Sequence, residues 1–352
     1  MTSWVAHAAL VATVMSLSAE ALAHDLVGIA REPKSTGNAA VGRERGNLST
    51  QPRGIDAAIQ SILDLRLPDS RSQALHVDTW SVQAVILRSK TWDTNDTIKA
   101  CFYGGSATVR TAIIAYAREW TKYGNIVLDG GLGPSLRSCV RGDGASIRIA
   151  FNVDGHWAKV GTDAAPLARS NLPTMNLEGL DTEDPDTDSF RETVLHEFGH
   201  AFGFHHEHQS PLSGCEAQLD KKKIKELTHL SDAEIVESFA QLKTSHLVPI
   251  GDGLRSGRLE DSGDRIELTE YDPTSIMHYS IDERYFIQPP GSCHVKQPTG
   301  LSGDDQKAMK AAYPYMTESE LRKKHNRDVR ILASFASKPG EAVKIRRLLR
   351  GD

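Results

Sequence analysis

Residues 196–206 read HEFGHAFGFHH, and this stretch says more about the chain than any other. On a helix, residues four apart lie on one face, so His196 and His200 can direct imidazole nitrogens at one ion. Gly203 lets the chain leave the helix in a left-handed turn, after which His206 can return as a third ligand. Three neutral imidazoles with one open position are typical of catalytic zinc. The spacing therefore predicts that His196, His200 and His206 bind one Zn²⁺ ion.

Glu197 directly follows the first histidine of this motif. Its carboxylate is expected beside the metal and not on it. A carboxylate in that place can take a proton from water and pass it to a departing amine. Glu197 is therefore predicted to be the general base of a metal-dependent hydrolysis.

A second motif, SIMHY, occupies residues 275–279. Taken alone it would be a hydrophobic turn. Together with the extended histidine motif it resembles the Met-turn of the metzincin proteases. The resemblance implies that Met277 packs beneath the three histidines without binding the metal.

The subfamily follows from two further residues, since Glu207 follows the third histidine and Tyr279 ends the second motif. Both features are similar to the astacin family, over about residues 76–315, whereas the calcium-binding repeats usual in serralysins are absent. The resemblance implies that Tyr279 is catalytic, its hydroxyl reaching the metal and then stabilising the oxyanion. The ligand spacing of the family selects His206, so the neighbouring histidines are expected to be packing or supporting residues. These neighbours are His205, His208 and His278.

The body of the chain alternates strand and helix signals. A helix with Ser106 as its N-cap is predicted, and the active-site helix is expected to begin at a capping box of Ser189 and Glu192. The charged segment 216–270 is expected to be a largely helical insertion. Strands are predicted over residues 82–87, 98–103, 126–128, 146–151 and 157–160. With the resemblance, this predicts an α+β, metzincin-type catalytic domain: a mixed twisted sheet with an active-site helix, and a mostly irregular or helical C-terminal subdomain.

The ends of the chain differ from this body. Residues 1–23 are predicted to be a signal peptide, because no charged residue precedes Glu20 and residues 21–23 read ALA, a pattern cleaved by signal peptidase. An amphipathic N-terminal helix is the alternative. Residues 24–75 are rich in Gly, Pro, Ser and Asn and are expected to be a linker or a pro-segment. Residues 316–352 form a basic tail with ten basic and five acidic residues.

All four cysteines lie beyond the predicted signal peptide, and none belongs to a CxxC pair. Two disulfides formed in an oxidising compartment are therefore predicted, with buried free thiols as the alternative. Four cysteines allow three pairings. We favour Cys101 with Cys139 and Cys215 with Cys293, because each pair flanks one half of the domain.

Composition limits the remaining possibilities. The 352 residues include 41 Lys and Arg against 46 Asp and Glu, a net charge of −5, which gives no support to nucleic-acid binding. No apolar run beyond the N-terminal segment is long enough to span a membrane.

The sequence thus predicts a secreted, or periplasmic, zinc endopeptidase that acts on protein or peptide substrates. The alternatives are a zinc-binding recognition module of the same fold without proteolytic activity, and a different metal hydrolase such as a carbohydrate deacetylase. The sequence carries no signal for an oligomeric state.

Overall fold

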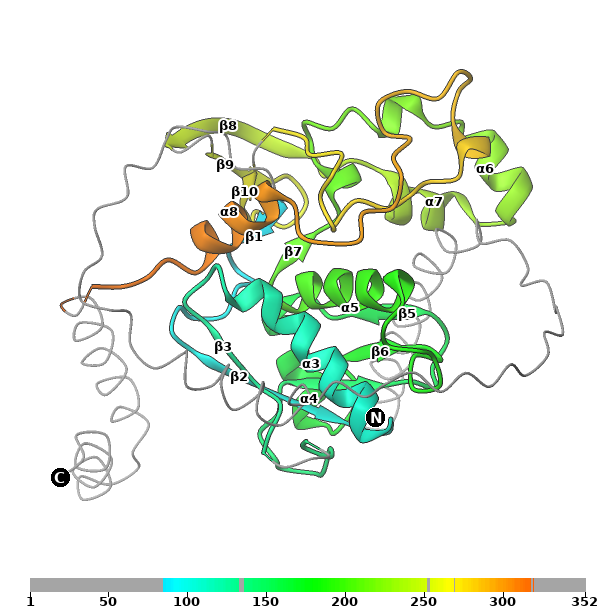
Figure 1. Cartoon of the computed structure of the whole chain (residues 1–352). Helices are drawn as coiled ribbons and strands as arrows, with labels where there is room; N and C mark the ends of the chain where they lie inside the picture. The colour runs from blue at the N-terminus through cyan, green and yellow to red at the C-terminus, as the bar shows by residue number, and fades with distance from the viewer. Residues whose placement is uncertain (1–84, 133–135, 252–253, 269, 318, 320–352) are drawn as a thin grey trace, which may run out of the picture.

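The computed structural model describes residues 85–132, 136–251, 254–268, 270–317 and 319 (Figure 1). The predicted signal peptide and the predicted linker or pro-segment lie outside these residues, and so does nearly all of the basic tail. Within the described part of the chain, no helix has the length and apolar character needed to cross a membrane.

The first half of the described chain builds a sheet with the strand order β3-β2-β4-β6-β5. Four of its strands run parallel, and β5 pairs antiparallel with β6 at one edge. The strands are β2 (Thr97–Phe102), β3 (Val127–Asp129), β4 (Ile147–Ala150), β5 (His156–Ala158) and β6 (Met175–Leu177). The strands predicted between residues 98 and 160 are confirmed to within about two residues.

A second, fully antiparallel sheet has the order β7-β1-β10-β9-β8. The strands are β1 (Val85–Leu87), β7 (Phe204–His205), β8 (Thr244–Gly251), β9 (Leu254–Leu259) and β10 (Arg265–Leu268). The expectation of a largely helical insertion over 216–270 is therefore wrong for its second half. Ile266 and Leu268 pack with Val85 and Leu87 in a small core. These partners lie far away in the sequence, so no local pattern announced the pairing. The many charged residues of the segment further hid its strand character.

Two long helices pack together over the first sheet: α3 (Ala107–Thr121) and α5 (Asp188–Ala201) (Figure 1). The Ser106 hydroxyl accepts a hydrogen bond from the amide of Val109 and caps α3, as predicted. The capping box predicted for α5 is wrong, because the N-cap is Thr187, whose hydroxyl accepts from the amide of Phe190. Ser189 already lies inside the helix, one residue after its start.

The shorter helices lie later in the chain, apart from α4, which precedes β6. They are α4 (Ala164–Arg169), α6 (Lys221–Thr228), α7 (Asp232–Phe239) and α8 (Gly303–Ala312). Together with the two sheets, these elements confirm the predicted α+β class for the described residues, with a second sheet that the prediction did not include.

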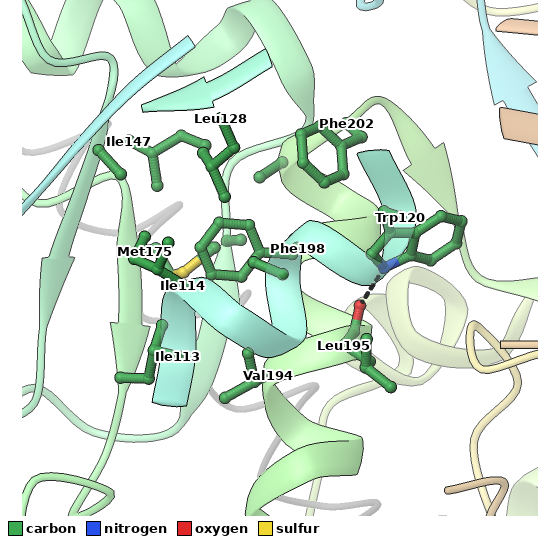
Figure 2. Close-up of a cluster of buried hydrophobic side chains, with 14 of the residues drawn as sticks. Ile113, Ile114, Trp120, Leu128, Ile147, Met175, Val194, Leu195, Phe198 and Phe202 are labelled. Carbon is green, nitrogen blue, oxygen red and sulfur yellow. Dashed lines mark hydrogen bonds between the residues drawn. The ribbon is translucent and has the colours of Figure 1, made fainter. Parts of the chain in front are cut away.

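The main hydrophobic core lies between α3, α5 and the first sheet (Figure 2). Trp120 of α3 is completely buried, and its indole N–H donates to the backbone carbonyl of Leu195 in α5 at 2.9 Å. The same indole stacks on Phe204, with ring centroids 5.0 Å apart. These contacts hold α5 firmly against the core, so side chains on its opposite face have defined positions.

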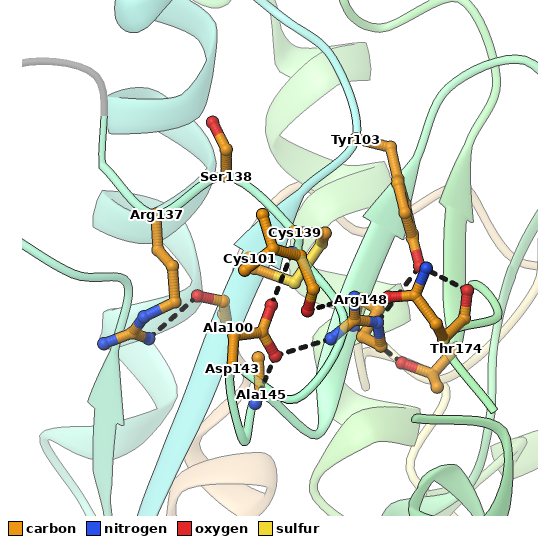
Figure 3. The surroundings of a disulfide bond; sticks show 12 residues. Ala100, Cys101, Tyr103, Arg137, Ser138, Cys139, Asp143, Ala145, Arg148 and Thr174 are labelled. Carbon is orange, nitrogen blue, oxygen red and sulfur yellow. Dashed lines mark hydrogen bonds and ion pairs between the residues drawn. A yellow bond between two sulfur atoms is a disulfide. The ribbon is translucent and has the colours of Figure 1, made fainter. Parts of the chain in front are cut away.

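Two disulfides join distant parts of the described chain, with the pairing favoured above. Cys101 of β2 is bonded to Cys139, in a loop that a buried ion pair between Arg148 and Asp143 also anchors at 2.6 Å (Figure 3). Cys215 is bonded to Cys293, and both belong to the small core beneath α6 and α7. The disulfides therefore fasten one loop in each half of the domain.

Candidate metal centre

Three imidazoles gather at the C-terminal end of α5. His196 and His200 lie one turn apart on the helix and are 4% and 3% exposed. The chain then turns at Gly203, which has a φ of 95°, a conformation that a residue with a Cβ adopts only at a cost. This turn returns His206 to the other two histidines. One ring nitrogen from each of the three lies within 4.8 Å of the others.

The hydrogen bonds of these rings determine their orientation. Nδ1 of His196 lies 2.8 Å from the carbonyl oxygen of Ile276, and Nδ1 of His200 lies 2.8 Å from that of Phe204. A carbonyl oxygen can only accept, so in both rings Nδ1 carries the proton and Nε2 keeps a lone pair. Both lone pairs are thus available to an ion.

This donor set fits zinc. A tetrahedral site with Zn–N bonds of about 2.0–2.1 Å separates ligand nitrogens by about 3.3 Å. The Nε2 atoms of His200 and His206 are 2.9 Å apart, close to that value. A cation bound between these two nitrogens would be attracted by the lone pair that each neutral imidazole can direct at it. Three neutral imidazoles are also ligands that zinc prefers.

Two other groups of potential ligands occur among the described residues: Cys215, His278 and Cys293, and Cys101, Cys139 and Asp143. In both groups the cysteines are joined in disulfides. A disulfide sulfur is not a thiolate and does not serve as a zinc ligand. The histidine triad is therefore the candidate metal centre of the described chain.

Glu197 and Tyr279 lie beside this triad. Glu197 is 2% exposed and follows His196 on α5. The Tyr279 ring stacks on that of His196 at 4.7 Å between centroids, and its centroid lies 4.3 Å from that of His206. Burial, and then the charge of Glu197, hold the pKa of Tyr279 well above its usual range, so the phenol keeps its proton. The structure thus brings together all five predicted site residues.

The Met-turn lies directly beneath the helix that carries two of the histidines. Met277 is 2% exposed, and a Cβ added to Gly199 of α5 would lie only 2.2 Å from its sulfur. Its carbonyl accepts a hydrogen bond from the amide of Glu207 at 3.0 Å. Met277 therefore supports the centre from below, as the resemblance implied.

Asp305 of α8 supports the Met-turn and was not predicted. It is 1% exposed, and its carboxylate accepts from the Ser275 hydroxyl at 2.7 Å and from the Ile276 amide at 2.9 Å. The same carboxylate accepts from the amide of Ser302 and closes the capping box of α8. The capping pattern was visible in the sequence as Ser302 and Asp305, but nothing there indicated a partner 30 positions away.

The neighbouring histidines take other positions. His208 is completely buried, and its Nε2 donates to the carbonyl of Ser238 at 2.9 Å. Nε2 of His278 lies 2.7 Å from the Tyr271 hydroxyl. Burial lowers the pKa of His208 to about 3 and that of His278 to about 4, so both rings are neutral. Neither belongs to the triad.

Glu207, which follows the third histidine, is also buried, at 1% exposed. One of its carboxylate oxygens accepts from the amide of Asp272 at 3.0 Å. Burial raises the pKa of Glu207 to about 8. This carboxyl faces the Met-turn segment and is not among the residues that gather at the triad.

A cleft of about 240 Å³ opens beside the triad. Its walls include His200, His206 and Tyr279 from the centre, and Ala158 from the edge strand β5. The remaining lining residues are Val160, His205, Gln209, Glu237, Ser238 and Leu242. A ligand in this cleft would lie against both the edge strand and the metal-binding rings.

Replacing Gly199 by alanine is expected to loosen the centre. The new methyl group would overlap the sulfur of Met277 and lie 3.0 Å from the ring of Trp120, and both of these side chains are buried. Overpacking of this kind costs about 1–3 kcal/mol, more than the ~1 kcal/mol that alanine gains over glycine in a helix. Urea unfolding of the metal-free protein measures the loss. Gly303 is the matched control, since a Cβ there meets nothing within 4 Å; equal stability of both variants would contradict the argument.

Comparison with known proteins points to one type of fold. No protein-family model matches this chain, and neither does any curated protein. The chain is similar to the solved structure of myroilysin, with a TM-score of 0.51 and 27% identity over 66% of this chain and 100% of that one. A crystal structure of myroilysin aligns with a TM-score of 0.43 and 28% identity, over 64% and 87% of the two chains. High choriolytic enzyme 1, a hatching enzyme zinc-protease from the medaka fish Oryzias latipes, aligns with a TM-score of 0.40 and 17% identity, over 65% and 96%. The comparison of folds rests on the first of these, whose TM-score exceeds 0.5.

Proposed function

Since this chain has an astacin-like metzincin fold, we propose that it is a secreted metalloendopeptidase that hydrolyses peptide bonds at one Zn²⁺ ion held by His196, His200 and His206. The observation that carries the proposal is the convergence of three imidazole nitrogens within 4.8 Å, beside the buried Glu197. The two disulfides support an oxidising compartment outside the cytoplasm.

The edge strand β5 is the element that would hold a substrate. It pairs with β6 at the edge of the first sheet, and Ala158 at its end lines the cleft. An extended peptide binds such an edge as an additional strand, through main-chain hydrogen bonds that do not depend on sequence. A peptide in this place would carry one of its carbonyl groups past the three histidines.

Glu197 would move the proton. Bound zinc supplies Lewis acidity, which makes water more acidic and polarises a carbonyl group. The Glu197 carboxylate takes a proton from the attacking water and delivers it to the amine nitrogen as the C–N bond breaks. Its burial keeps competing water away from this transfer.

Tyr279 would stabilise the oxyanion. Its phenol keeps its proton and can therefore donate a hydrogen bond to the oxygen that becomes negative in the transition state. The ring lies against His196 and His206, so a carbonyl group held at the metal would be close to Tyr279.

A digest of casein with the purified protein tests the proposed function. Cleavage that stops with 1,10-phenanthroline and returns with added zinc is the expected result. A protein that binds one equivalent of zinc and cleaves neither casein nor labelled peptides would be the recognition module instead. Acetyl release from a carbohydrate without peptide cleavage would identify a deacetylase.

Replacing Tyr279 by phenylalanine is expected to lower kcat by about 10²–10³-fold, the usual cost of losing one oxyanion donor. The ring keeps its stacking on the histidines, so zinc content and KM are expected to change little. Steady-state kinetics on a fluorogenic peptide, with zinc analysis of the same sample, measures both. Tyr271→Phe is a control that removes a partly buried hydroxyl bonded to His278 instead. A Tyr279→Phe enzyme as fast as the wild type would remove Tyr279 from the mechanism.

A further inference from the structure

The third histidine is held differently from the other two. Nδ1 of His196 and of His200 meets a backbone carbonyl, whereas Nδ1 of His206 lies 3.1 Å from the side-chain oxygen of Gln209. The same side chain reaches further, because its amide nitrogen donates to the carbonyl of Glu237 in α7 at 2.9 Å. Gln209 is only 8% exposed.

From this arrangement, and resting on the proposed function, we infer that Gln209 is a positioning residue that orients His206 for the metal and links the ring to the C-terminal end of α7. The direction of the link follows from hydrogen-bond chemistry. The Glu237 carbonyl can only accept, so the amide nitrogen of Gln209 must face it and the amide oxygen must face His206. That oxygen also only accepts, so Nδ1 of His206 carries the proton. Its Nε2 therefore keeps a lone pair, directed at the nearby Nε2 of His200.

The Glu237 carbonyl, which accepts from Gln209, lies at the C-terminal end of α7. The last four carbonyls of a helix have no partner within it and carry partial negative charge. In α7, those of Glu237 and Ser238 accept from Gln209 and His208, two consecutive residues of the segment that follows the third ligand. The residues that follow His206 thus cap α7, and α7 in turn holds Gln209, which orients His206.

This link also joins the metal centre to the cleft. Gln209, Glu237 and Ser238 all line it, together with His206 itself. Gln209 therefore links the wall of the cleft formed by α7 to the His206 ring.

Two substitutions at Gln209 test its two hydrogen bonds, to His206 and to Glu237, separately. Gln209→Met removes both hydrogen bonds, whereas Gln209→Glu keeps an acceptor for His206 and loses the donor to α7. Gln241 provides the matched control: its amide donates to Ser210 and Ser213 of the same segment at 2.8 and 3.2 Å and contacts no histidine of the triad. Zinc affinity is measured by competition with a chromophoric chelator, and thermal unfolding of the metal-free proteins is followed in parallel.

Gln209→Met is expected to weaken zinc binding by about 10–100-fold, the usual effect of losing the partner of a metal-binding histidine. Gln209→Glu is expected to stay within about threefold of wild-type affinity while its metal-free form unfolds at a lower temperature. Gln241→Met is expected to change zinc affinity less than about twofold. Unchanged affinity in Gln209→Met, or an equal loss in Gln209→Glu or in Gln241→Met, would overturn the inference. A wild-type protein that binds zinc but cleaves no peptide would reject the proposed function and leave this comparison valid.

Discussion

Replacing Glu197 by alanine is expected to abolish measurable peptide cleavage, with kcat reduced by about 10³-fold or more, while one zinc ion stays bound. General base catalysis contributes about 10²–10⁴-fold, and Glu197 is the buried carboxylate that directly follows the first histidine of the triad. The three histidines are expected to keep their orientation, because Nδ1 of each ring is held by Ile276, Phe204 or Gln209. Turnover of a fluorogenic peptide and zinc content by elemental analysis measure the two effects.

Glu197→Gln tests the same point with less change of shape, and is expected to be nearly as inactive because an amide is not a base. Glu226, an exposed glutamate of α6 that pairs with Lys222, is the control, and Glu226→Gln is expected to retain full activity. Cleavage at the wild-type rate by Glu197→Ala would break the assignment. Loss of zinc from both Glu197 variants would show that the carboxylate holds the metal and is not a base beside it.

Replacing Asp305 by alanine is expected to cause a large loss of stability. The carboxylate accepts from the amides of Ile276 and Ser302, which lie in the Met-turn and at the start of α8. Alanine leaves the Ile276 amide buried without a partner, at a cost of about 1–3 kcal/mol, and it also removes the acceptor of the partly buried Ser302 amide; removal of a buried charge partly offsets the loss. Urea unfolding of the metal-free protein measures the change. Asp304→Ala is the control, because Asp304 forms only a partly exposed pair with Lys307, and its loss is expected to cost less than about 1 kcal/mol.

Asp305 also makes stability depend on pH. Burial, and then the nearby charge of Asp272, raise the pKa of Asp305 from 3.8 to about 6, although three hydrogen bonds oppose the rise. A carboxyl with a raised pKa in the folded state binds its proton first in that state. The contribution of this shift to the free energy of unfolding is therefore present at low pH and is lost as the pH rises from about 4 through about 6.

Asp305→Asn removes this titration while its amide oxygen can still accept from both backbone amides. The difference in unfolding free energy, wild type minus variant, is expected to fall by up to about 3 kcal/mol between pH 4 and pH 7. Because Glu207 and the histidines titrate in both proteins, the difference isolates Asp305. If the unfolding free energies of the wild type and of Asp305→Asn changed equally with pH, Asp305 would have its ordinary pKa.

Several of the predictions that succeeded depend on neighbours in the sequence. His196, Glu197 and His200 lie within about one turn of one helix, so the 3.6-residue period places them together in any fold that forms this helix. Gly203 has the left-handed conformation that its place after the helix required. The exact start of α5 was wrong because Thr187 and Ser189 are both good N-caps, and local pattern alone does not choose between them.

The sequence by itself therefore determined the metal-binding motif, the proposed base beside it and the α+β class, because each depends on contacts between residues a few positions apart. Only the tertiary structure decided what supports the motif. Ile276 meets His196 across 80 positions, Asp305 meets Ser275 across 30, and Gln209 meets Glu237 across 28. Strand β10, at 265–268, likewise pairs with β1, far away in the sequence. Such contacts form when the whole core packs and buried polar groups find their partners, and no local spacing encodes that choice.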